Sequence, residues 1–205
     1  MVCRLLLLSL VFNLLVANIV KYGGELYMDS QNARNIGMGG YSVSFSDGRN
    51  PALLIHAHEP SLHFSHKNKF TGLARVSSFS YLHHSSINGN QSPLYFSIIN
   101  RIVNNIPDTR AAWTDRNGNL NPEIDEINYF DINEISQNEI GLRIAYLRKY
   151  DKFAIGISIK PTYTSLAEYS AWGLTSDVAA IVPLSYDKME FSVRAEDIIG
   201  ITRWN

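Results

Sequence analysis

The chain has 205 residues, of which 45% are hydrophobic and 18% charged, and this composition excludes an intrinsically disordered chain. Eighteen Lys and Arg residues against nineteen Asp and Glu residues leave a formal net charge of -1, so there is no basic field to hold a nucleic-acid backbone, and nucleic acid is not expected as a partner. The mean hydropathy of -0.09 is too polar for a helical membrane protein but leaves an alternating β-barrel open.

Residues 1–20 have the pattern of a secretory signal peptide. One positive charge, Arg4, precedes an apolar stretch that is shorter than the roughly 20 residues a spanning helix needs. We therefore expect export and removal, although no A-x-A spacing marks the cleavage site. The single cysteine, Cys3, lies inside this leader, so the mature chain is expected to have no disulfide and no thiolate metal site.

Residues 21–60 are Gly-rich and poorly periodic, and a period of two begins at Ser61. Within residues 153–160 the large apolar side chains Phe153, Ile155, Ile157 and Ile159 fall on one face, and Ala154, Gly156, Ser158 and Lys160 fall on the other. This alternation predicts strands with one apolar face. A secreted soluble sandwich would show the same alternation.

Seven strands are predicted, at about 61–67, 70–83, 93–100, 139–148, 152–164, 172–184 and 189–198. Short polar turns at 88–90, 150–152 and 186–188 fall on one rim by strand parity, and the 101–138 loop and the 165–171 connection fall on the other. One rim with short turns and one with longer loops is typical of outer-membrane barrels. The aromatic residues near strand ends agree with lipid interfaces: Tyr146, Tyr150, Tyr163, Tyr169 and Trp172.

The predicted fold class is therefore all-β, a transmembrane antiparallel up-and-down β-barrel. Bacterial barrels have an even number of strands, so seven strands predict that residues 61–205 are the N-terminal half of a longer barrel. An open sheet of this kind has two unpaired edges and no place in a bilayer by itself.

Residues 23–54 carry an A-R-x-x-G-M-G-G segment followed by an acidic turn and an N-P-A motif. The matching positions are Ala33, Arg34, Gly37, Met38, Gly39 and Gly40, then Asp47, then Asn50, Pro51 and Ala52. This segment resembles the N-terminal signature of FadL-like outer-membrane proteins. Residues 106–113, 115–126 and 169–174 look most like the PorV/PorQ family within that group. One departure is NPALL, where the family usually has N-P-A-G-L.

The resemblance implies a barrel of about fourteen strands in the bacterial cell outer membrane, with residues 21–60 folded into the lumen as a plug. It also implies a non-enzymatic role in the type IX secretion pathway. The partners would be outer-membrane lipid, components of the secretion system and secreted cargo proteins, which the loop 101–138 would bind and shuttle. The alternative is a FadL-like channel for hydrophobic molecules.

The loop at 115–126 matches the spacing of a calcium-binding loop. Oxygen-bearing side chains stand at Asp115, Asn117, Asn119, Asn121, Glu123 and Glu126. Leu120 occupies the position that normally requires glycine, so calcium competes with a polar external loop rich in turn-forming residues. All six histidines lie between His56 and His84, but the odd spacing of His63 and His66 disfavours a zinc site. The sequence contains no recognised catalytic motif and predicts no cofactor other than calcium.

Overall fold

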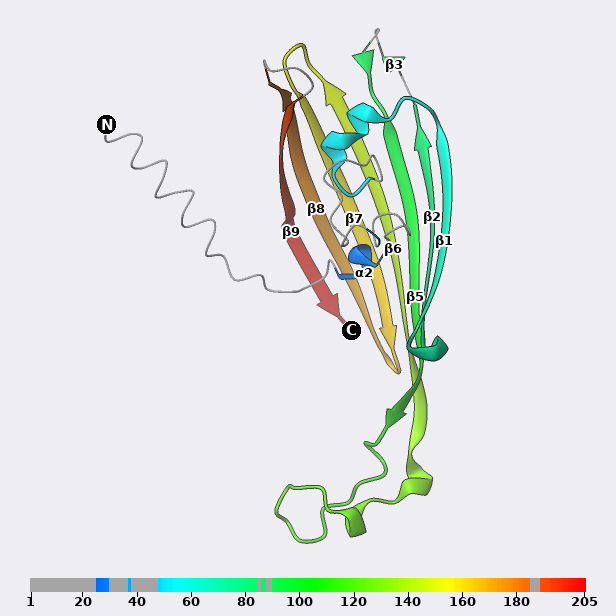
Figure 1. The fold of residues 1–205 in the computed structure, drawn as a ribbon. Coiled ribbons are helices and arrows are strands. Elements are labelled where there is room, and N and C mark those ends of the chain that lie inside the picture. Colours follow the sequence, from blue (N-terminus) through cyan, green and yellow to red (C-terminus); the bar gives the residue numbers. More distant parts are fainter. Residues whose placement is uncertain (1–24, 30–36, 38–47, 85, 88–89, 185–188) are drawn as a thin grey trace, which may run out of the picture.

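A computed structural model describes residues 25–29, 37, 48–84, 86–87, 90–184 and 189–205. Its main element is a seven-stranded antiparallel sheet in which the neighbours follow the chain order (Figure 1). The strands are β1 (Ser61–Lys69), β2 (Ala74–His83), β5 (Leu94–Asp108), β6 (Asn133–Lys149), β7 (Ala154–Leu166), β8 (Tyr169–Pro183) and β9 (Glu190–Trp204). A two-residue pair, β3 (Ser86–Ile87) and β4 (Asn90–Gln91), forms a separate hairpin.

The all-β, up-and-down architecture with seven strands in one antiparallel sheet is confirmed. In the described residues the sheet is open, with β1 and β9 at its edges. Closure into a barrel of about fourteen strands stays a prediction. No helix in the described part of the chain is both long and apolar enough to cross a membrane.

The predicted strand ends need correction on the rim that carries the long loop. β5 continues to Asp108 through a bulge after Val103, and β6 begins at Asn133, so the loop spans 109–132 instead of 101–138. The connection expected at 165–171 is a turn of only two residues, with Ala167 at a φ of 49°. The predicted difference between the rims therefore rests on one loop.

Two smaller corrections concern the ends of β2 and β9. The strand predicted at 70–83 begins only at Ala74, because the 3-10 turn η2 (Phe70–Gly72) reverses the chain first. The last strand runs to Trp204, six residues past its predicted end at 198. The turn predicted at 186–188 and most of the turn at 88–90 lie outside the described residues.

Two short helical segments from the N-terminal region lie on one face of the sheet, which we call the inner face (Figure 1). The segment η1 (Pro51–His56) packs on β6, β7 and β8, and α2 (Glu25–Met28) packs on β5 and β6. The main core forms under η1, where Leu53 and Leu54 are buried against Tyr95, Leu147 and Ile181.

Glycines on β6 and β7 allow η1 and α2 to pack close to the sheet. A Cβ atom at Gly156 would overlap the Pro51 carbonyl of η1, and one at Gly141 would lie 2.9 Å from the side chains of Leu26 and Tyr27. Both positions therefore require glycine because the N-terminal segments pack directly on the strand backbone.

Candidate functional site

The face opposite η1 and α2, which we call the outer face, carries large apolar side chains that remain exposed. On β7 the sequence prediction of alternation is confirmed. Ile155, Ile157 and Ile159 are 37–50% exposed, whereas Ser158 and Lys160 are buried on the inner face. The same pattern continues on the neighbouring strands, where the outward and exposed residues include Phe64, Phe79, Ile98, Ile140, Leu174, Val178, Val193 and Ile201.

Aromatic pairs stand at both ends of this apolar surface. Tyr163 and Trp172 have ring centroids 4.8 Å apart near the rim that carries the 109–132 loop, and Tyr150 and Phe153 stack at 4.8 Å at the opposite rim. Phe153, the residue before β7, and Tyr163 on β7 are ten residues apart. At about 3.3 Å per residue and a tilt of about 40°, they span a height of about 25 Å, the height of the apolar band of an outer-membrane barrel.

The apolar band is widest on β7 and β8 and narrows toward β1. One cross-strand row reads His66, Ser77 and Asn100 on β1, β2 and β5. The same row continues as Ile140, Tyr163 and Trp172 on β6, β7 and β8. The polar members form hydrogen bonds: the His66 ring nitrogen lies 2.9 Å from the Ser77 hydroxyl, and the Asn100 amide donates to the Asn138 side chain at 2.6 Å. The band on β1 and β2 is therefore shorter than on β7.

The inner face holds a buried charge cluster between β7, β8 and β9. The Lys160 ammonium donates to the Asp177 carboxylate at 2.6 Å and to the Asp197 carboxylate at 2.7 Å, and the Ser158 hydroxyl donates to the other Asp177 oxygen at 2.8 Å. The Lys160 and Asp177 side chains are only 4% and 1% exposed. The bulge in β9 turns Asp197 inward at a φ of 50°, which gives Lys160 its second partner.

Tyr27 of α2 occupies a gap in the sheet next to this cluster. The β6–β7 pairing is interrupted between Gly141–Thr162 and Ile144–Ile159. Pro161 lies in this gap, and proline has no N–H for the ladder. The Tyr27 hydroxyl lies 3.0 Å from the Leu142 carbonyl oxygen and 2.6 Å from that of Pro161, and donates its proton there. The hydroxyl thus replaces the donor that Pro161 lacks, and it ties α2 to two strands.

Two cations also lie near the Tyr27 ring. The Arg143 guanidinium carbon lies 5.1 Å and the Lys160 nitrogen 5.5 Å from the ring centroid, within the range of cation–π attraction. Among the described residues the buried Arg143 Nε has no hydrogen-bond partner, so the aromatic ring compensates part of the desolvation of this cation. Nothing in the sequence pattern pointed to Tyr27, which is 134 residues from Pro161.

The structure describes only part of the N-terminal motif. Asn50 caps η1, with its side-chain oxygen accepting from the Ala52 N–H at 3.0 Å and its amide nitrogen donating to the Ser192 hydroxyl at 3.2 Å. Pro51 and Ala52 are buried under this cap. Gly37 is described and has open space around its Cα. Ala33, Arg34, Met38, Gly39, Gly40 and Asp47 lie outside the described residues, as does the predicted leader 1–20.

The 109–132 loop has an ordered core built around Glu126, whose side chain is buried. One Glu126 oxygen accepts from the Trp113 indole at 3.2 Å and the other from the backbone N–H groups of Arg116 and Asn117 at 3.0 and 3.3 Å. The Trp113 bond, with these backbone bonds, holds the pKa of Glu126 below its ordinary value of 4.5. At the base of the loop, Arg110 donates to Glu168 on the neighbouring turn at 2.6 Å.

The predicted calcium ligands lie together in this loop, but their oxygens bond to the loop itself. Asp115 accepts from the N–H groups of Gly118 and Leu120, and Glu123 accepts from the side-chain amides of Asn117 and Asn119. Leu120 adopts a φ of 58°, the conformation for which calcium loops normally use glycine. No cluster of three or more His, Cys, Asp or Glu side chains in the described ranges is arranged for a metal, and calcium stays a prediction.

Comparison with protein-family models, with curated proteins and with solved structures found no match for this chain.

Proposed function

We propose that this chain forms wall strands of a bacterial outer-membrane β-barrel. The observation that carries the proposal is the outer face. Its apolar side chains lie between aromatic pairs at the two ends of the strands, while the inner face of the same strands is small, polar or charged. At the tilt of barrel strands this band would be about 25 Å high. A row of exposed isoleucine side chains is unfavourable in water. When acyl chains cover the row, the apolar surface leaves water and this cost is removed.

The open edges of the sheet bear on how the wall is completed. In hydrocarbon an unpaired strand edge leaves N–H and C=O groups without partners, at several kcal/mol each. The proposal therefore requires further strands against β1 and β9, and a closed barrel of about fourteen strands meets that requirement. The N-terminal segments on the inner face would then lie inside the barrel as a plug.

The specific role we propose is that of PorV/PorQ proteins, which the motifs at 23–54 and 106–126 resemble. In that role the protein would bind secreted cargo of the type IX pathway at the outer surface and pass it to the attachment machinery. The ordered 109–132 loop is the surface best suited to binding, since Phe130 and Ile124 are 98% and 82% exposed on a loop fixed by Glu126. Apolar side chains presented on a rigid frame bind with little loss of entropy.

The alternative, a channel for hydrophobic molecules, finds less support. The inner face presents Lys160, Asp177, Arg143 and several serines and threonines, which would not favour passage of an alkyl chain.

The test is co-purification of the intact protein, from its native outer membrane, with secreted proteins that bear a C-terminal sorting domain. We expect Phe130→Ser with Ile124→Ser to reduce the bound cargo, and Leu184→Ser, an exposed apolar residue near the opposite rim, to leave it unchanged. Equal cargo in all three samples would refute the role of the loop. Loss of labelled fatty-acid uptake on deletion, with normal secretion, would favour the channel.

A further inference from the structure

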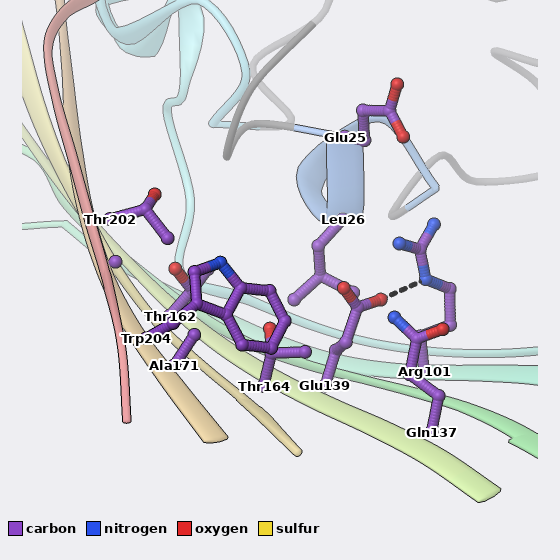
Figure 2. Close-up of a pocket in the computed structure, with 11 residues that line it drawn as sticks. Glu25, Leu26, Arg101, Gln137, Glu139, Thr162, Thr164, Ala171, Thr202 and Trp204 are labelled. Atoms are coloured by element: carbon purple, nitrogen blue, oxygen red, sulfur yellow. Dashed lines mark hydrogen bonds and ion pairs between the residues drawn. The ribbon is translucent and has the colours of Figure 1, made fainter. Parts of the chain in front are cut away.

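A cavity of about 390 Å³ lies on the inner face between α2 and strands β5 to β9 (Figure 2). Its volume falls within the range of small-molecule sites. The cavity lies beside the Tyr27 contact, close to the rim that carries the 109–132 loop, and none of the roles discussed above uses it.

Hydroxyl and amide groups line part of the cavity. Thr162, Thr164 and Thr202 contribute hydroxyls from three strands, and Gln137 contributes a side-chain amide. Each of these groups can both donate and accept hydrogen bonds. Such groups match a ligand whose own groups are both donors and acceptors, and Leu26, Ala171 and Trp204 give the rest of the lining an apolar surface.

The charges around the cavity disfavour an anion. Arg101 is neutralised by Glu139 and by Asp29, which it reaches at 3.2 Å, and Asp29 also pairs with Lys69. Within the part of the chain that is described, Glu25 has no ion-pair partner. The charged residues of the lining are Arg101, Glu139 and Glu25, which sum to one net negative charge and disfavour fatty-acid carboxylates and phosphates.

One flat aromatic surface completes the lining. The Trp204 indole points into the cavity, and the side chain is 58% exposed (Figure 2). An indole offers an apolar face together with one N–H donor. The ring C–H groups of a sugar pack on such a face while its hydroxyls bond to surrounding polar groups.

We propose that this cavity binds a neutral saccharide of one or two rings. The threonine hydroxyls and the Gln137 amide form hydrogen bonds with the sugar hydroxyls, and Trp204 packs against the flat side of one ring. Because Arg101 is paired with Glu139 and Asp29, the described lining has no unpaired cation to bind an anion. The site goes beyond the proposed cargo role, because it lies on the inner face and not on the 109–132 loop.

The experiment uses the intact protein in lauryldimethylamine oxide, a detergent without a sugar headgroup, with saturation-transfer NMR of maltose, glucose and decanoate. We expect transfer to maltose or glucose and none to decanoate. Thr164→Val keeps the side-chain shape and is expected to weaken sugar binding about three- to tenfold through the lost hydrogen bond. Trp204→Leu should abolish it, and Thr109→Val, outside the cavity, should not change it.

Absence of transfer to both sugars, equal binding by all variants, or transfer to decanoate alone would each overturn the proposal. Partition of the same sample into detergent micelles is measured first. A protein that partitions normally but binds no sugar would therefore refute the saccharide site and leave the membrane assignment standing.

Discussion

The contact between Tyr27 and the β6–β7 gap gives a quantitative prediction. Tyr27→Phe keeps the ring and therefore both cation–π contacts, but it removes the hydroxyl that donates to the Leu142 and Pro161 carbonyls. A buried acceptor left without a partner costs about 1–3 kcal/mol. We expect the free energy of unfolding of the intact protein to fall by that amount.

A double-mutant cycle separates this effect from simple loss of packing. Pro161→Ala restores an N–H opposite Leu142, so in that background the Tyr27 hydroxyl is no longer needed and Tyr27→Phe should cost less. Urea unfolding in lipid vesicles, followed by tryptophan fluorescence, measures all four proteins. Tyr146→Phe serves as a control, because no hydrogen bond of its hydroxyl is seen among the described residues. Equal costs of Tyr27→Phe in both backgrounds, within about 0.5 kcal/mol, would refute the replacement of the missing donor.

Four further predictions concern Gly156, Lys160, Glu126 and the 115–126 loop. Gly156→Ala should displace η1 at a cost of about 1–3 kcal/mol and speed proteolysis of the N-terminal segment, whereas Gly200→Ala, with open space at its Cβ, should not. Lys160→Met leaves a buried carboxylate uncompensated and should lower the free energy of unfolding by about 3–5 kcal/mol in a urea titration. The Glu126 carboxylate orders the loop in its charged form, and its pKa is lowered in the folded protein. Its stabilising contribution is therefore complete above about pH 4.5 and is lost as the pH falls below that value and Glu126 becomes protonated. Hydrogen exchange of the loop amides should show this loss, and Glu126→Gln should remove its pH dependence. If the 115–126 loop binds calcium, calorimetry of the intact protein should give heat that Asp115→Asn abolishes, and no heat at millimolar calcium would remove calcium from the account.

The period-two pattern predicted the strands of the seven-stranded sheet because alternation is a local property of the sequence. The alternation within residues 153–160 alone assigns each side chain to one face of the sheet, and the neighbouring strands are not needed for this assignment. The strand ends were less predictable. Residues 101–108 contain a bulge and Pro107, which break the alternation, although they continue β5. Likewise, Tyr169 fell in the predicted 165–171 connection but belongs to β8.

The contacts of the N-terminal segments could not be read from periodicity. Pro161 in a central strand argues against a strand until a donor from elsewhere in the chain is known. That donor, Tyr27, comes from a segment with no strand or helix pattern long enough to predict. The buried cluster at Lys160 depends in the same way on a bulge that turns Asp197 inward, a feature with no composition signal.

The central claim is that the outer face of the sheet touches acyl chains, and spin labels test it most directly. In a variant without Cys3, single cysteines at Ile157 on the outer face and at Thr202 on the inner face are labelled in the intact protein in lipid vesicles. We predict that the Ile157 label collides more often with oxygen, which concentrates in the hydrocarbon, than with a water-soluble nickel chelate, and that the Thr202 label does the reverse. A label at Ile157 that is reached freely by the nickel chelate would contradict the claim.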